Sequence, residues 1–327
     1  MKGSQERERE IINRIDNMIN NNSDIPCLKG YRYFIRSGRA SSSVYQYLVT
    51  VKNFMRFVSK DPKDLSIDDY TSYLGSIETK TSSYQITAYT ALKKFSLYLN
   101  ANKINEENPF QYLDRPKPVE SLETQIKREK GFLTKKEIKK VKENIMHGVG
   151  DCKAIIRQEK TRERDLAIVM TLLSTGMRVS ALIKLDIDNL YADDHSLKVV
   201  DKGGKTMVYP LADEAWNAME NWLKRREEML HGMSEDALFL SSRSNKRLKR
   251  DGIVKMLDKY TYNIEGKHIT PHKLRATYGT QLYNATKDIY FVQKCMNHSN
   301  PKTTELYVRG QGRETEEASK IMNNLLD

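Results

Sequence analysis

One stretch decides the fold class: LKVVDKGGKTMVYP, residues 197–210. Its two ends are rich in β-branched and aromatic residues, and Gly203-Gly204 between them supplies the positive φ that a tight hairpin turn requires. Lys202 lies at that turn. Because helical periodicity fills most of the remaining chain, the sequence predicts a mainly α protein with a small β-sheet.

Helical patterns surround this hairpin. The helix that precedes it opens with Thr134 as N-cap and Glu137 as the partner of a capping box, and it runs to Ile145. Further helices are expected at residues 213–226, 251–260, 271–284, 289–296 and 314–326. The last of these carries an apolar stripe on an otherwise polar tail, made of Ala318, Ile321, Met322, Leu325 and Leu326.

The N-terminal part of the chain has a different organisation. Residues 1–25 read as a leading helix, and residues 26–111 as a small helical domain with helices at 44–58, 68–77 and 84–99. The prolines within residues 114–118 remove backbone donors and favour extended structure, so we expect a linker over 112–132. The second domain then covers residues 133–327.

Composition limits the classes of protein to consider. The chain has 327 residues, 55 Lys and Arg against 43 Asp and Glu, and a formal net charge of +12. An excess of this size suggests a polyanionic partner, nucleic acid before a membrane surface, although many basic proteins are simply soluble. The mean hydropathy is −0.67 and the start, MKGSQERERE, lacks the apolar core of a signal peptide. We expect a cytoplasmic, nucleoid-associated protein.

Three segments of the second domain hold candidate reactive residues. Arg178 follows Gly176 at the junction of two helices, where a capping glycine and a surface arginine are the simpler interpretation. His272 and Arg275 lie one turn apart on a helix beginning at Pro271, so they could clamp a phosphate or merely flank an amphipathic helix. Tyr307 follows His298 by nine residues.

Metal and disulfide chemistry have little support. Cys27, Cys152 and Cys295 are too few and too scattered for a disulfide framework or a four-ligand zinc site. Cys295 and His298 would be half a metal site, but no second pair lies at ligand spacing. We expect no metal and no cofactor.

Together, these segments resemble the tyrosine recombinase, or phage integrase, family. The resemblance lies in the order of an arginine, a hairpin lysine, a His-x-x-Arg pair, and a histidine nine residues before a tyrosine. It spans the second domain, and the helical first domain is similar to that family's core-binding domain. The resemblance implies a catalytic set made of Arg178, Lys202, His272, Arg275, His298 and Tyr307.

The sequence departs from the family pattern at three positions. Ala181 stands where an acidic residue is common, Ala276 where a second histidine is common, and Asn297 where glycine is usual before the third-box histidine. None of these removes a reacting group. The hairpin also offers Lys205 as an alternative to Lys202 for the general acid.

The chemistry implied is DNA strand cleavage and rejoining. A tyrosine that attacks a phosphodiester forms a 3′-phosphotyrosine and conserves the bond energy, so integration, excision or resolution of DNA would need no cofactor. The resemblance implies a homotetramer on double-stranded recombination sites, held through exchange of the C-terminal tail, with an accessory DNA-bending or directionality protein as a further partner. The short stretch before the helical domain favours a Xer-like or mobile-element enzyme.

Two other functions fit the same residues less well. One is a topoisomerase-like enzyme that nicks and reseals a single duplex, and the other is a DNA-binding regulator with a vestigial catalytic set. Basic runs at Lys135-Lys136, Lys139-Lys140 and Arg243–Arg250 are candidate phosphate-contact surfaces, or solvated charged faces.

Overall fold

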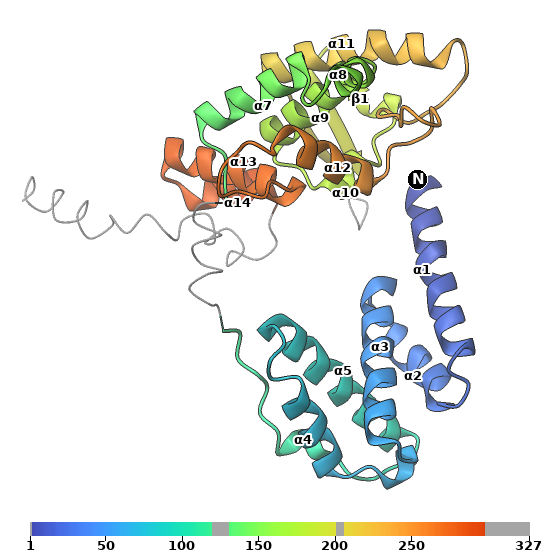
Figure 1. The fold of residues 1–327 in the computed structure, drawn as a ribbon. Helices are drawn as coiled ribbons and strands as arrows, with labels where there is room; N and C mark the ends of the chain where they lie inside the picture. The colour runs from blue at the N-terminus through green and yellow to red at the C-terminus, as the bar shows by residue number, and fades with distance from the viewer. Residues whose placement is uncertain (1, 120–130, 201–205, 298–327) are drawn as a thin grey trace, which may run out of the picture. The chain divides into compact units, whose positions relative to one another are not determined.

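The chain divides into two compact units, Met1–Ser121 and Leu122–Asp327 (Figure 1). A computed structural model describes residues 2–119, 131–200 and 206–297. Each unit has its own hydrophobic core, one built from residues 15–110 and the other from residues 133–274. Each can therefore be considered by itself.

The first unit is a bundle of helices around aromatic side chains. Phe54 stacks on Tyr70 at 4.7 Å between ring centroids, and Tyr31 meets Phe95 edge-on at 5.3 Å. The buried Tyr31 hydroxyl donates to the Ala91 carbonyl at 2.7 Å, so its polar end is satisfied inside the core. The helices are α1 (Lys2–Asn20), α2 (Cys27–Arg36), α3 (Ser41–Val58), α4 (Ile67–Ser76) and α5 (Ser82–Ala101), with 3-10 turns η1 (Pro62–Asp64) and η2 (Pro109–Gln111).

The leading helix belongs to this bundle. α1 packs along α3, and its Ile15 is 2% exposed within the same core. The three helices expected at 44–58, 68–77 and 84–99 are α3, α4 and α5, while α2 was not expected. α2 has ten residues and carries Gly30, whose missing side chain makes room for the Tyr98 hydroxyl.

The second unit is built around α9, which packs against α7, α11 and α13. Figure 1 shows α11 along one side of this unit and α13 with α14 on another. The elements are α7 (Lys135–His147), α8 (Cys152–Glu159), α9 (Arg162–Thr175), α10 (Val179–Leu182), η3 (Ile187–Asn189), β1 (Leu190–Tyr191), β2 (Ser196–Val200), β3 (Thr206–Pro210), α11 (Asp213–Leu230), α12 (Arg250–Tyr260), α13 (Pro271–Thr286) and α14 (Ile289–Met296).

The expected hairpin is confirmed as β2 and β3. The two strands pair antiparallel, with Val199 opposite Met207 and Val200 opposite Thr206. β1 adds a third, two-residue strand on the other side of β2, which was not expected because a strand of that length leaves no alternating pattern. Residues 201–205, which include Lys202 and Lys205, lie outside the described residues. The fold class, mainly α with a small sheet, is confirmed.

The capping box at the start of α7 is also confirmed. The Thr134 backbone N–H donates to Glu137 Oε2 at 2.7 Å, and the Glu137 N–H donates to Thr134 Oγ1 at 3.3 Å. Lys267 Nζ donates to the same Glu137 oxygen at 2.7 Å. Burial raises the pKa of Glu137, but the hydrogen bonds from Lys267 and Thr134 outweigh it, so the pKa lies below its ordinary value.

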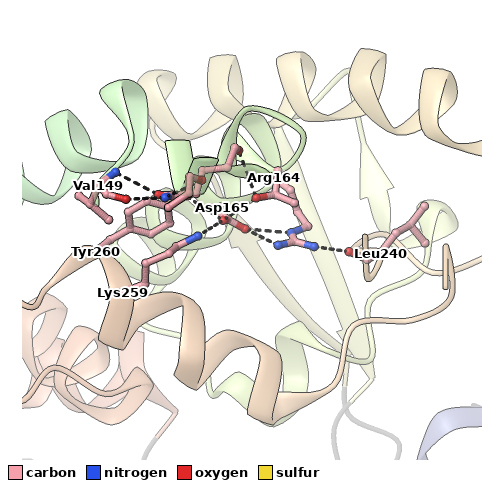
Figure 2. A network of polar contacts seen from close by, with 9 residues as sticks. Val149, Arg164, Asp165, Leu240, Lys259 and Tyr260 are labelled. Carbon is pink, nitrogen blue, oxygen red and sulfur yellow. Dashed lines mark hydrogen bonds and ion pairs between the residues drawn. The ribbon is translucent and has the colours of Figure 1, made fainter. Parts of the chain in front are cut away.

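A buried polar network fixes α9 to α12 (Figure 2). The Asp165 carboxylate is fully buried and accepts from Arg164 Nε at 2.9 Å and from Arg164 Nη2 at 2.6 Å. Its other oxygen accepts from the Tyr260 hydroxyl at 3.2 Å and from Thr161 at 3.1 Å, with Lys259 Nζ 3.5 Å away. Arg164 also donates to the Leu240 carbonyl at 2.8 Å, which ties in the chain after α11.

The other expected helices appear as α11, α12, α13 and α14, and the helix expected at 314–326 lies outside the described residues. Among the described helices, none has the length and apolar character needed to cross a membrane.

Candidate active site

Arg178 lies in a turn whose shape is set by Gly176. Gly176 caps α9 with φ of +58°, in the left-handed region, and its N–H donates to the Leu172 carbonyl at 3.0 Å. The chain then becomes extended at Arg178, which is exposed and caps α10, its carbonyl accepting from the Ala181 and Leu182 N–H groups. Gly176 is therefore the capping glycine of α9, and the chain after it exposes Arg178 at the surface.

Arg275 joins the segment of Arg178 to the segment that precedes His298. It is 5% exposed on α13, where it lies one turn after His272. Its Nη1 donates to the Gly176 carbonyl, and its Nη2 donates to the Met296 carbonyl at 2.6 Å. These two acceptors lie two residues before Arg178 and two residues before His298. The guanidinium therefore brings the three motif segments to one place.

His272 is surrounded by positive charge. Burial is the largest cause that lowers the pKa of His272, and the positive charges of Arg250, Arg275 and Arg178 lower this pKa further. The histidine is therefore neutral at neutral pH and able to accept a proton. Arg178, Arg250 and Arg275 are therefore close enough to His272 for their charges to act on it.

Arg250 is a residue that the sequence did not single out. It is the first residue of α12, it is exposed, and its charge acts on His272 more strongly than those of Arg275 and Arg178. Its only sequence signal is membership of the basic run Arg243–Arg250, in which nothing distinguishes it from its neighbours.

That basic run has two kinds of member. Arg247 is engaged inside the unit: its Nη1 donates to the Ile183 carbonyl at 3.1 Å and to the Leu185 carbonyl at 3.0 Å, and its Nη2 pairs with Asp186. Arg243, by contrast, is exposed. Arg247 therefore stabilises the fold, whereas Arg243 remains a candidate phosphate contact.

Asn297 explains one departure from the family pattern. It caps α14 with φ of 49° and ψ of 52°, in the left-handed region, and its N–H donates to the Lys294 carbonyl at 3.0 Å. Asparagine is the residue that tolerates this conformation best after glycine. The backbone that a glycine would give before His298 is therefore also available to this chain.

Three of the expected site residues, Lys202, His298 and Tyr307, lie outside the described residues. β2 ends at Val200, before Lys202 in the chain, and β3 begins at Thr206, after it. Within the described part of the chain, no group of three or more His, Cys, Asp or Glu side chains is arranged to hold a metal ion.

Comparison with known proteins decides the family. The sequence model of the Phage integrase family matches residues 132–313, which is more than half of the chain. The chain belongs to the phage integrase family. By this membership it is a site-specific tyrosine recombinase.

Two curated relatives of this phage integrase family member are both named tyrosine recombinase XerC. The tyrosine recombinase XerC of Roseiflexus sp. (strain RS-1) is 27% identical over 279 residues, covering 82% of this chain and 83% of its own. The tyrosine recombinase XerC of Haemophilus influenzae (strain PittEE) is 35% identical over 147 residues, covering 44% of this chain and 48% of its own.

A solved structure supports the two-unit fold. The XerH site-specific recombinase, bound to a palindromic difH substrate in a post-cleavage complex, aligns with a TM-score of 0.71 at 19% identity. The alignment covers 96% of this chain and 89% of the other. Nothing in these comparisons favours a topoisomerase-like enzyme or a vestigial regulator.

Proposed function

We propose that this recombinase cleaves and rejoins double-stranded DNA through a 3′-phosphotyrosine formed by Tyr307, with Arg178, Lys202, His272, Arg275 and His298 completing the catalytic set. The observation that carries the proposal is the placement of Arg275. Its guanidinium is held by the carbonyls that precede Arg178 and His298 by two residues, so residues far apart in sequence converge on one point.

The reaction balances without a cofactor. The Tyr307 oxygen attacks the scissile phosphorus, the bond from phosphorus to the 5′-oxygen breaks, and the 3′-phosphate stays on the tyrosine. His272 accepts the tyrosine proton, a role that suits its lowered pKa, and Lys202 donates a proton to the leaving 5′-oxygen. Attack by a 5′-hydroxyl of the partner strand reverses these steps and releases Tyr307.

Two arginines neutralise the charge that develops on the nonbridging oxygens, and His298 adds a hydrogen bond to the same phosphate. Each such fixed donor is worth about 3 kcal/mol in the transition state, by analogy with an oxyanion-hole donor. Replacing Arg178 or Arg275 by lysine should therefore cost much of the cleavage rate, because an ammonium cannot form the planar fork that two phosphate oxygens accept.

Covalent trapping tests the nucleophile. A nicked suicide substrate, which releases the short 5′-hydroxyl strand after cleavage, should accumulate a protein–DNA adduct with the wild-type chain and none with Tyr307→Phe. Specific DNA binding should remain because only the reacting oxygen is lost. An adduct that persists in Tyr307→Phe would refute the assignment of the nucleophile.

A second substrate tests the general acid. If sulfur replaces the 5′-bridging oxygen, the leaving group is a thiolate that needs no proton, so Lys202→Ala should recover cleavage on this substrate. Recovery in Lys205→Ala and not in Lys202→Ala would assign the proton donor to Lys205.

The partner of the site is proposed from its relatives. XerH is bound to a palindromic difH substrate in its structure, and we propose that this chain likewise binds recombination sites in duplex DNA. Residues 26–111 would serve as the core-binding domain and residues 133–327 as the catalytic domain, joined by the linker over 112–132. A two-site recombination assay separates strand exchange from nicking and resealing of one duplex.

We further propose a homotetramer that docks residues 314–327 of each protomer on its neighbour, acting at the nucleoid with an accessory DNA-bending or directionality protein. The tail stripe supports this, because a short amphipathic helix is not stable unless its apolar face is covered. Deleting residues 314–327 should weaken pairwise cooperativity and synapsis while half-site binding and the melting temperature persist. Loss of half-site binding and of thermal stability would instead indicate packing of the tail within its own protomer.

A further inference from the structure

The side chain of Tyr278 occupies the space beside Gly176. A Cβ added at Gly176 would lie 2.2 Å from Tyr278 Cδ1 and 2.8 Å from its Cγ, which is far inside van der Waals contact. The ring therefore lies directly against the backbone of the turn that presents Arg178. The positive φ of Gly176 and the close approach of the ring both exclude a side chain at this position.

The other end of the same side chain reaches α14. The Tyr278 hydroxyl lies near the Cys295 thiol, and Cys295 lies three residues before His298. Burial and the nearby thiol raise the pKa of Tyr278 to about 12, so the hydroxyl stays neutral at physiological pH. One half-buried residue therefore packs on the segment before Arg178 and lies near the segment before His298.

Tyr278 also shares a helix face with Arg275. The two residues are three apart on α13, so they are neighbours on its surface. Arg275 holds the turn from one side through a hydrogen bond to the Gly176 carbonyl. The Tyr278 ring adds a second contact from α13 to the same residue, so the turn is fixed against this helix at two points.

We propose that Tyr278 is a positioning residue for cleavage: its ring fixes the orientation of the Gly176 turn, and hence of Arg178, against the helix that carries His272 and Arg275. The inference rests on the proposed function. A displacement of a catalytic group by about 1 Å is enough to lower a rate about 100-fold, so loss of the ring should act on the chemical step.

The test is single-turnover cleavage of the nicked suicide substrate at saturating enzyme, with half-site affinity and melting temperature measured in parallel. We expect Tyr278→Ala to lower the cleavage rate constant about 10- to 100-fold with a half-site Kd within about twofold of wild type. Tyr278→Phe should stay within about threefold, because the ring remains. Tyr283→Ala is the matched control, since Tyr283 lies on the same helix and its ring meets Lys287 instead.

Enlarging Gly176 and shortening Tyr278 tests the contact between these two residues. Gly176→Ala should impair cleavage at least as strongly as Tyr278→Ala, and the double variant Gly176→Ala/Tyr278→Ala should be no worse than Gly176→Ala alone, since the clash is gone. Losses that multiply in the double variant would overturn the proposal. If Tyr278→Ala does not fold, Tyr278→Leu takes its place in both measurements.

The outcomes separate this inference from the proposed function. A wild-type chain that binds its site and forms no adduct contradicts the recombinase mechanism. A wild-type chain that forms the adduct, with Tyr278→Ala cleaving at the wild-type rate and losing only thermal stability as Tyr283→Ala does, overturns the positioning role and leaves the mechanism standing.

Discussion

Replacing Asp165 by asparagine removes one charge and changes almost no volume. In the network of Figure 2, one carboxylate oxygen accepts two hydrogen bonds from Arg164. The other oxygen accepts hydrogen bonds from Tyr260 and Thr161 and forms an ion pair with Lys259. The amide oxygen of Asp165→Asn has to face Arg164, because the Arg164 side chain is 9% exposed and that of Lys259 is 33% exposed. The amide nitrogen then faces the ammonium of Lys259.

The cost follows from these contacts. Two hydrogen bonds between Arg164 and a carboxylate become bonds to a neutral oxygen, at a loss of about 1 kcal/mol each, since charged hydrogen bonds contribute about 1.5–3 and neutral ones about 0.5–1.5 kcal/mol. The loss of the ion pair at Lys259 brings the total to about 3 kcal/mol, the lower end of the range for a broken buried pair, because Lys259 is partly open to solvent. For a unit of this size the melting temperature should fall by about 6–12 °C.

Tryptophan fluorescence during urea unfolding measures this change in one unit. Both tryptophans of the chain, Trp216 and Trp222, lie in the second unit, so the signal reports that unit alone. The control is Glu214→Gln, which breaks the exposed pair with Lys142 and should cost less than about 1 kcal/mol. If Asp165→Asn costs no more than this control at an unchanged m-value, the network does not stabilise the unit as argued.

Three further outcomes are expected. Asn297→Val should destabilise the second unit by about 1–2 kcal/mol in the same fluorescence assay, because a β-branched residue is strained at this φ. Asn297→Gly should lie within about 0.5 kcal/mol of wild type. Equal costs for the two variants would contradict the backbone argument. Arg250→Gln should move the acid limb of the cleavage-rate profile to higher pH, because a cation that lowers the pKa of His272 is removed; an unmoved limb would separate His272 from that limb or Arg250 from His272. The plot of log DNA affinity against log salt concentration should be steep, and Arg243→Gln should reduce its slope by about 0.9. Arg247→Gln should leave this slope unchanged and lower the melting temperature, because Arg247 is bonded inside the unit. The reverse pattern would exchange the roles of the two arginines.

Sequence patterns predicted several elements that keep one face in water, although α2 and α8, which also do so, were missed. α14 was predicted with its observed bounds, and β2 with β3 followed from β-branched and aromatic residues on either side of two glycines. α9 was missed because it has little polar face: most of its residues, from Ala167 to Leu172, are buried, so no helical period is visible. The short β1 and α10 depend on contacts made elsewhere in the fold.

For the site, the order of the motifs predicted a set of residues, and the structure adds the contacts that hold the described ones. The anchors of Arg275 are backbone carbonyls, which every residue possesses and no pattern marks. Arg250 and Tyr278 came to notice only through their neighbours in space, His272 and Gly176, to which neither is adjacent in the chain. Asn297 could be interpreted only when its φ was known.

The main-chain anchoring of Arg275 has an evolutionary consequence. A carbonyl oxygen survives every substitution at its own residue, so drift in the side chain of Met296 does not by itself delete the acceptor. Any substitution at Met296 that keeps the backbone path therefore keeps the acceptor as well. A lineage can exchange much of the surrounding sequence and keep the arginine seated, provided that the turn at residue 176 and the end of the helix at residue 296 retain their conformations.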